Sequence, residues 1–471
     1  MSKAVVIGAG PTGLATAMLL AQKGMEVVVL DRDDPAPAEP AAAWTGWDRR
    51  SVAQFHQVHF FQPGGRALLQ DRLPAVFDQL LAAGAVRFNL AEVRARQLPT
   101  GPGGVDFSPF ETVTTCRRPV LEFAFVAAAR AVRAIEIRHR CPVTELVTGP
   151  EVIDGVPHVT GVRTQAGETV SGDVVIDVAG RRSPVPALIE AAGGRRPVER
   201  SEDAGFVYNT RFYRGPTTPE YVGDLLCAIG SISLLTVPGD DGHWAVTLYH
   251  SPKDKAMRKV RDPAVFERVL RALPWHAHWV DGEPVSDVVS MASTANTTRD
   301  FVIDGRPCAT GILPIGDAWG FTNPSIGRGI TLGLKHAVAV TDAITPVLAA
   351  PCDMATAWDE ATRAHARPWH EATMQFDRVR GPEVEAHLFG RPDPHDPSNP
   401  AIAGPRAFAS ASHYDPQVLA WFSEISSCVA LPSEVLGAAG RLEHIAEVAS
   451  QNPPYVTPGP NRSELEALLS A

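Results

Sequence analysis

The stretch AVVIGAGPTGLATAMLL, residues 4–20, decides the fold of this chain. It opens with an apolar run typical of a strand that is buried on both faces of a parallel sheet. Gly8, Gly10 and Gly13 follow in GxGxxG spacing, and Pro11 stands where the first turn of a helix would begin. The remaining residues are apolar and suit a buried helix. We therefore predict a strand, a glycine-rich turn and a helix in this order.

A second apolar run, MEVVVLD, follows the helix and ends at Asp31. In such a strand–turn–helix–strand unit, Gly8 permits the tight turn, Gly10 lets the backbone approach a pyrophosphate, and Gly13 lets helix and strand pack closely. Free N–H groups at the start of the helix would bind the pyrophosphate, and Asp31 would accept hydrogen bonds from an adenosine ribose. The unit predicts a dinucleotide site without distinguishing NAD from FAD.

A second glycine-rich segment, ILPIGDAWGFTNPSIGRG, spans residues 312–329. Its strand-like run is followed by Asp317 and later by Gly327 and Gly329. A carboxylate can accept hydrogen bonds from ligand hydroxyls, and glycines let backbone N–H groups approach a ring. Taken alone, Asp317 could instead be a helix cap.

The chain between the two glycine-rich segments differs from a simple nicotinamide dehydrogenase. Residues 116–132 suit an amphipathic helix, and a strand and a hairpin with its turn near Ala166 and Gly167 follow. A further buried strand ends at Gly180. A nicotinamide dehydrogenase would more often repeat the strand–helix–strand unit here.

This order of motifs resembles the FAD-dependent monooxygenases of the para-hydroxybenzoate hydroxylase fold, the kin of aromatic hydroxylases and styrene epoxidases. The likeness covers roughly residues 1 to 345. It implies an α/β fold: a glutathione-reductase-type Rossmann FAD-binding domain with an inserted β-sheet substrate domain and a helical C-terminal part. The expected FAD-binding domain comprises residues 1–75, 105–189 and 296–375, the substrate domain 76–104 and 190–295, and the C-terminal region 376–471.

The resemblance also explains why one protein needs two glycine-rich loops. It implies that Gly316 and Asp317 meet the ribityl and pyrophosphate part of FAD, while the turn from Pro324 to Gly329 passes the isoalloxazine ring. A helix beginning near Ile330 would direct its positive end at the flavin. The residues expected to bind non-covalent FAD are Gly8, Gly10, Pro11, Thr12, Gly13, Asp31, Arg32, Arg49, Arg118, Val143, Gly180, Gly316, Asp317, Pro324, Gly327, Gly329 and Ile330.

Two residues are candidates for catalysis. Family members place polar residues over the flavin at the position of Arg49, and His59 could hydrogen-bond substrate or flavin. His56 and His243 are further candidates for a general base. The pairs His56/His59 and His276/His278 have no acid or cysteine set nearby in the sequence, so we predict no metal site.

The segment from about residue 190 to 295 suits a β-sheet that forms the floor of a substrate cavity. GFVYNTRFYRG alternates like a strand, and SISLLTVPGDDGHWAVTLYH suits two strands joined by a turn. Phe206, Tyr208, Trp244 and Tyr249 are candidates for the lining of that cavity. The proline-rich residues 389–405 are expected to form a long surface loop before a helical end of the chain.

Departures from the family pattern concern the reductant. Many aromatic hydroxylases carry Asp-Gly where this chain has Ala179 and Gly180, and a histidine where it has Trp319. The Asp-Gly element has been linked to the nicotinamide cofactor. NADPH or NADH is therefore expected to reduce FAD either directly or through a separate flavin reductase.

Composition limits the remaining partners and the location. The net charge of −10 gives no basic surface for nucleic acid. The six cysteines are scattered and suit reduced thiols in a cytoplasm. No apolar stretch reaches the roughly 20 residues that a membrane span needs.

The sequence therefore predicts a flavin-dependent monooxygenase. It would insert one oxygen atom from O₂ into a small apolar aromatic or alkene substrate, by hydroxylation or epoxidation, through a flavin C4a-hydroperoxide. The main competing hypothesis is an FAD-dependent dehydrogenase or alkene reductase without oxygen transfer. Two further hypotheses are a nicotinamide dehydrogenase and a non-catalytic flavin or nucleotide sensor.

Overall fold

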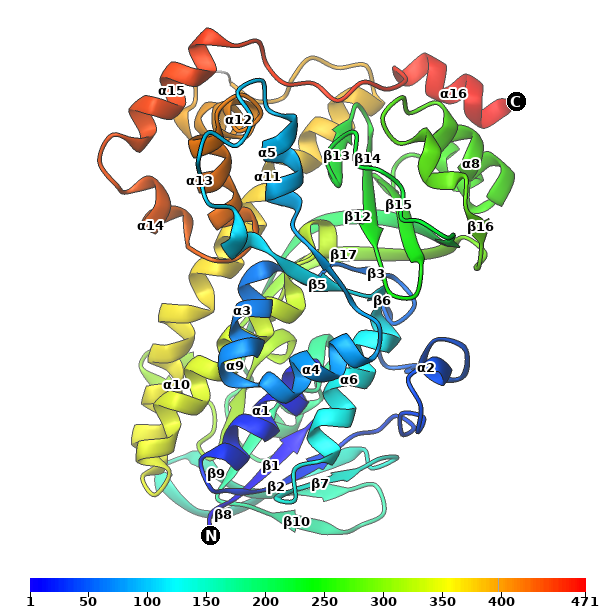
Figure 1. The fold of residues 1–471 in the computed structure, drawn as a ribbon. Coiled ribbons are helices and arrows are strands. Elements are labelled where there is room, and N and C mark those ends of the chain that lie inside the picture. Colours follow the sequence, from blue (N-terminus) through cyan, green and yellow to red (C-terminus); the bar gives the residue numbers. More distant parts are fainter. Residues whose placement is uncertain (397) are drawn as a thin grey trace.

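The structure, a computed structural model, describes residues 1–396 and 398–471, and at 293 and 294 only the backbone. Figure 1 shows two halves stacked lengthwise, with the N-terminus at the bottom and the C-terminal helices over the upper half. The lower half is built around a parallel sheet and the upper half around an antiparallel one.

The parallel sheet has the strand order β20-β11-β1-β2-β7. Its strands are β1 (Lys3–Ile7), β2 (Glu26–Leu30), β7 (Ile135–Arg138), β11 (Val174–Asp177) and β20 (Ile312–Pro314). All neighbours run parallel, and α1 (Pro11–Gln22) is the crossover between β1 and β2. The strand–turn–helix–strand prediction is confirmed. Both glycine-rich loops leave the same edge of the sheet, because parallel strands place their carboxyl ends together.

The parallel sheet is the middle of three layers. The antiparallel strands β8 (Val143–Ile153), β9 (Val156–Thr164) and β10 (Thr169–Ser171) cover one face, which confirms the predicted hairpin. On the other face lie α1, α6 (Arg118–Arg130) and α9 (Gly329–Ile344), and α10 (Pro351–His365) packs on α9. The main hydrophobic core fills these layers.

The upper half contains an antiparallel sheet with the order β13-β14-β15-β12-β17-β21 and β16 beside β12. Its strands are β12 (Val198–Arg214), β13 (Leu226–Ile229), β14 (Ile232–Pro238), β15 (His243–His250), β16 (Glu283–Pro284), β17 (Val289–Asp300) and β21 (Gly320–Phe321). The predicted pair of strands is thus the β14–β15 hairpin. Because β21 belongs to the second glycine-rich segment, this segment is hydrogen-bonded to the upper sheet.

The remaining N-terminal elements connect the two halves. They are α2 (Ala41–Gly46), β3 (Val58–His59), α3 (Pro63–Arg72), α4 (Pro74–Ala82), β4 (Val86–Phe88), α5 (Leu90–Gln97), β5 (Thr112–Thr114) and β6 (Cys116–Arg117). In the upper half, α8 (Pro263–Arg271) packs against the outer face of the antiparallel sheet. Within the described residues, no helix combines the length and hydropathy that a membrane-spanning segment needs.

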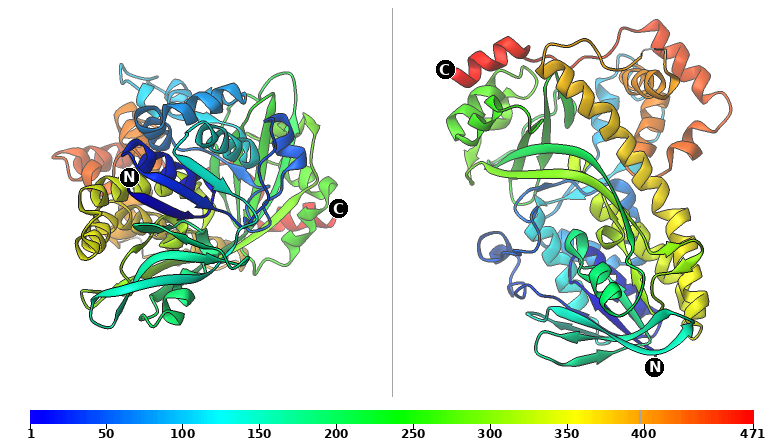
Figure 2. Two further views of the ribbon diagram at one scale, coloured as in Figure 1. Left: turned by 90° about the horizontal axis from the view of Figure 1, so that it is seen from below. Right: turned by 180° about the vertical axis from the view of Figure 1, so that it is seen from behind.

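One long helix, α11 (Arg367–Leu388), runs along both halves (Figure 2). The chain then forms α12 (Pro400–Ala411), α13 (Pro416–Ser426), α14 (Pro432–Leu436), α15 (Arg441–Gln451) and α16 (Arg462–Ser470). The predicted surface loop 389–405 is therefore wrong in its last part. Asn399 accepts a hydrogen bond from Ala401 N at 3.1 Å, and a cap of this kind with proline at the first helical position starts a helix.

Candidate active site

A large cavity of about 1990 Å³ extends from the carboxyl edge of the parallel sheet to the C-terminal helices. Every predicted FAD-binding residue lines it except Gly316, whose neighbour Asp317 does. His59 lines it as well. The fold thus brings the two glycine-rich loops, which are far apart in sequence, to one site.

The first glycine loop has an open position that faces the cavity. A Cβ on Gly8 would lie 2.6 Å from Val178 O, and one on Gly13 would lie 2.0 Å from Gly8 O. A Cβ on Gly10 would meet only Arg49 Nη1, at 3.9 Å. Packing therefore requires Gly8 and Gly13, whereas Gly10 leaves room for a ligand. The first turn of α1 also has neither a side-chain cap nor an acidic residue, which suits the pyrophosphate of FAD.

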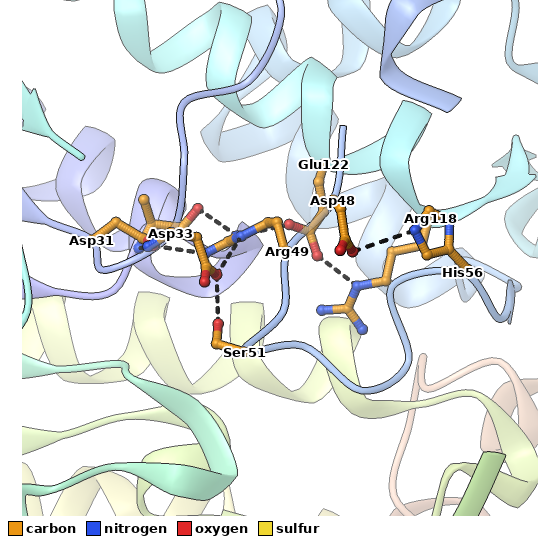
Figure 3. A network of polar contacts seen from close by, with 9 residues as sticks. Asp31, Asp33, Asp48, Arg49, Ser51, His56, Arg118 and Glu122 are labelled. Carbon is orange, nitrogen blue, oxygen red and sulfur yellow. Dashed lines mark hydrogen bonds and ion pairs between the residues drawn. The ribbon is translucent and has the colours of Figure 1, made fainter. Parts of the chain in front are cut away.

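The Asp31 carboxylate is held by the protein on both oxygens (Figure 3). Oδ2 accepts from Ala9 N at 2.5 Å and from Arg49 Nη2 at 2.6 Å, and Oδ1 accepts from Asp33 N at 2.8 Å. Arg49 also binds Asp33 and Glu122, so three carboxylates surround its buried guanidinium. Burial is the largest influence and would raise the pKa of Asp31, but the charge of Arg49 together with the N–H groups of Asp33 and Ala9 lowers this pKa. These groups keep Asp31 charged, and the predicted catalytic role of Arg49 stays a prediction.

His59 is half-buried, and both of its ring nitrogens are engaged. Its Nδ1 lies 3.0 Å from Gln57 O and its Nε2 lies 3.0 Å from Arg118 Nη1. The carbonyl oxygen needs a donor and the guanidinium an acceptor, so this arrangement requires the neutral ring protonated at Nδ1. Burial, and then the charge of Arg118, lower the pKa of His59 to about 3. As a base, His59 would first have to release Arg118, which also binds Glu122.

The depressed pKa of His59 predicts a loss of stability in acid. Below pH 6.5 the unfolded chain binds this proton more tightly than the fold does, so stability falls from pH 6.5 toward 3. The slope is at most about 1.4 kcal/mol per pH unit. His59→Gln has no imidazole to protonate. Its free energy of unfolding should therefore fall by about 1.5–2 kcal/mol less than that of the wild type between pH 6.5 and 5. Urea unfolding at both pH values checks this, and equal losses in the two proteins would contradict it.

The second glycine-rich segment lies against the first. A Cβ on Gly316, at φ +61°, would come within 3.2 Å of Thr12 Cγ2. The Asp317 carboxylate is partly exposed to the cavity and lies 3.6 Å from Arg181 Nε. It accepts no hydrogen bond from the part of the chain that the structure describes, so the helix-cap interpretation finds no support. Its oxygens are open to the ribityl hydroxyls of FAD.

The turn after β21 faces the segment around β3. Gly327 has φ +61°, in the left-handed region, and Gln62 Nε2 donates to Ile326 O at 3.1 Å. Helix α9 begins at Gly329, one residue before the predicted start at Ile330. Gly329 and Ile330 line the cavity, so the positive end of α9 lies in the cavity wall where the flavin is expected.

A buried carboxylate that the sequence did not reveal holds this turn in place. Asp377 in α11 accepts from Ser325 Oγ at 2.7 Å and from Asn296 Nδ2 at 3.0 Å, and Asn323 Nδ2 lies 3.4 Å away. Burial raises the pKa of Asp377 to about 6. Asn323 in turn accepts from Tyr208 Oη at 2.6 Å, which ties the turn to the upper sheet. No spacing in the sequence links these residues.

The aromatic lining differs in part from the prediction. Tyr208 and Tyr249 line the cavity with ring centroids 5.2 Å apart. Phe206 packs behind Tyr249. The prediction for Trp244 was wrong, because it packs into the opposite core with Trp279. Trp244 and Tyr249 stand at odd spacing on β15, and successive strand side chains point to opposite faces.

The two remaining candidate bases lie away from this lining. His56 pairs with Asp48, with 3.4 Å between Nε2 and Oδ1. His243 lies 3.4 Å from Arg117 Nη1, beside the ion pair of Arg117 and Asp240. Neither histidine is among the residues that line the cavity.

Comparisons with known proteins agree with this geometry. The model of the family described as "FAD binding domain" matches residues 1–372. Protein Rv3254 of Mycobacterium tuberculosis is 26% identical over 356 residues, which are 70% of each chain. The 6-hydroxy-3-succinoylpyridine 3-monooxygenase HspB of Pseudomonas putida is 25% identical over 370 residues, 74% of this chain and 80% of HspB.

A solved structure shares the fold. PqsL of P. aeruginosa, in complex with 2-aminobenzoylacetate, has a TM-score of 0.61 at 15% identity and covers 82% of this chain and 96% of its own. The predicted fold class, FAD and a flavin-dependent monooxygenase are confirmed by the family match and its relatives. The chain therefore belongs to the family of flavoproteins with this FAD-binding domain, the flavin-dependent monooxygenases of the para-hydroxybenzoate hydroxylase fold.

Proposed function

We propose that this flavoprotein transfers one atom of dioxygen to a carbon of a small, largely apolar aromatic or alkene substrate. The second oxygen atom leaves as water, and NADPH or NADH supplies the two electrons, directly or through a separate flavin reductase. The observation that carries the proposal is the continuity of the cavity. The glycine loops and the wall bearing Tyr208 and Tyr249 belong to one space, so a substrate can lie beside the flavin.

Each part of the chain has a role in holding the cofactor. The N-terminus of α1 and Gly10 would bind the pyrophosphate, Asp31 the ribose and Asp317 the ribityl chain. The turn held by Asp377 would lie beside the ring. The bound cofactor supplies electron transfer and the activation of dioxygen, so the chain itself needs no nucleophile.

The substrate side of the cavity suits an apolar ring. Its wall contains Leu226, Met291 and Phe408 besides the two tyrosines. Burying each CH₂ group there contributes roughly 0.8 kcal/mol, and exclusion of water keeps the activated oxygen from being wasted. The relative HspB is by its name a monooxygenase of an aromatic pyridine compound, which supports an aromatic substrate for this chain as well.

The reaction is tested with labelled dioxygen. Aromatic and alkene compounds are screened with NADPH or NADH, with and without an added flavin reductase, and the product is analysed by mass spectrometry. One labelled oxygen atom should enter the product. Turnover without label, or turnover in the absence of air, would instead support the FAD-dependent dehydrogenase or alkene reductase. Flavin that bleaches with NADPH alone would show that no separate reductase is needed.

A further inference from the structure

One buried arginine of this protein lacks a counter-charge. Among the described residues seven arginines are buried: Arg49, Arg117, Arg118, Arg211, Arg299, Arg328 and Arg380. Six of them have a carboxylate oxygen within 4.0 Å. Arg328 has none in the part of the chain that the structure describes, although it is only 7% exposed.

Arg328 stands in the wall of the active-site cavity. It lies between Gly327 and Gly329 on the turn expected beside the flavin and is the N-cap residue of α9. Its Nη2 donates to Ile425 O near the end of α13, at 2.9 Å. Its Nε is buried and has no hydrogen-bond partner. A single neutral carbonyl oxygen is thus the only partner that the described residues give this guanidinium.

Such an arrangement is unfavourable unless an anion completes it. A buried cation without a paired charge loses its hydration and regains little from one carbonyl oxygen. The N-terminus of α9, to which Arg328 belongs, adds partial positive charge of the same sign. The six paired arginines show that this fold otherwise supplies a carboxylate to each buried guanidinium. At Arg328, the cavity is the side from which an anion can come.

We propose that Arg328 binds a carboxylate group of the substrate, so that the substrate is an aromatic or alkene acid. The inference rests on the proposed function and specifies its substrate class. The guanidinium reaches toward α13, whose residues Phe422 and Ser423 also line the cavity. The carboxylate would lie between the flavin turn and α13, which leaves the apolar part of the molecule against the wall of Tyr208 and Tyr249.

Binding to the FAD-loaded protein tests this without any turnover. Two matched pairs of probes, benzoate with benzamide and 2-naphthoate with 2-naphthamide, are titrated in the absence of reductant, and the flavin absorbance change is measured. Wild type is compared with Arg328→Gln, which removes the charge, and Arg328→Lys, which keeps it. Arg378→Gln is the control, because Arg378 lines the same cavity but is half exposed and paired with Glu202.

The wild type should bind each acid about 10- to 100-fold more tightly than its amide, as expected for a charge-assisted hydrogen bond. Arg328→Gln should abolish this preference without weakening the amides, Arg328→Lys should keep part of it, and Arg378→Gln should keep all of it. Added salt should weaken acids only.

Equal affinity of the wild type for acid and amide would overturn the proposal, whether or not the variants fold. An unchanged preference for the acids in Arg328→Gln would also overturn it. If this variant changed only the midpoint potential of the flavin, the charge of Arg328 would serve the reduced cofactor, and the proposal would again be wrong. The outcome of the labelled-dioxygen experiment does not depend on the outcome of these titrations. An acid preference without label incorporation would refute the oxygen transfer and leave the carboxylate site standing.

Discussion

Replacing Gly10 by valine should give a folded protein that no longer retains FAD. Gly10 has φ −77° and ψ 176°, a conformation that any residue adopts, and its Cβ would meet only Arg49 Nη1, at 3.9 Å. The fold therefore tolerates a side chain, but that side chain enters the cavity where the pyrophosphate is expected. We expect FAD to bind at least roughly 100-fold more weakly, which corresponds to about 2.7 kcal/mol.

The measurement is the flavin absorbance per chain after desalting, together with a thermal unfolding curve. Gly46→Val is a matched control, because Gly46 is open and lies outside the cavity lining. Gly13→Ala should behave differently and unfold more easily, since its Cβ would lie 2.0 Å from Gly8 O. Full flavin content in Gly10→Val would place the pyrophosphate elsewhere.

The cofactor half of the site could be predicted because its determinants are local in sequence. Gly8, Gly10 and Gly13 act within one strand–turn–helix unit, and Asp31 ends the next strand. The order of these elements fixes their positions at one sheet edge. The second loop was predicted for the same reason, with an error of one residue at the start of α9.

The partners of the buried charges could not be predicted in this way. Arg49 lines the cavity, but its ion pairs with Asp31, Asp33 and Glu122 join a loop to a helix far along the chain. Asp377 reaches the flavin turn from α11. Such contacts depend on how whole elements pack, and nothing in the spacing of the sequence records that packing.

The lining of the substrate cavity falls between these cases. Three strands of the upper sheet, β12, β14 and β15, were predicted correctly, and the alternation of side chains along β15 already separates Trp244 from Tyr249. The packing of the helices decides which face of this sheet belongs to the cavity. Helices α8 and α16 cover the face that bears Trp244, whereas α11 packs on the face that bears Tyr249. The isolation of Arg328 likewise becomes visible only when every acidic neighbour can be placed.

Asp317→Ala should weaken FAD about 10- to 150-fold, or 1.5–3 kcal/mol, because it removes acceptors of charge-assisted hydrogen bonds from the ribityl chain. The fold should survive, since the carboxylate binds no backbone group among the described residues and lies 3.6 Å from the partly exposed Arg181. Asp317→Asn keeps one acceptor oxygen and should lose less. Titration of the apoproteins with FAD and with FMN checks this.

The two cofactor variants should differ in their response to FMN, because FMN has the ribityl chain but no adenylate. Asp317→Ala should weaken FMN and FAD to a similar extent, whereas Gly10→Val should affect FAD far more. A loss of FMN binding in both variants would mean that the valine disturbs the whole cavity. Unchanged FMN and FAD affinities in Asp317→Ala would mean that Asp317 serves Arg181 alone, and the ribityl chain would then need different acceptors along the same sheet edge.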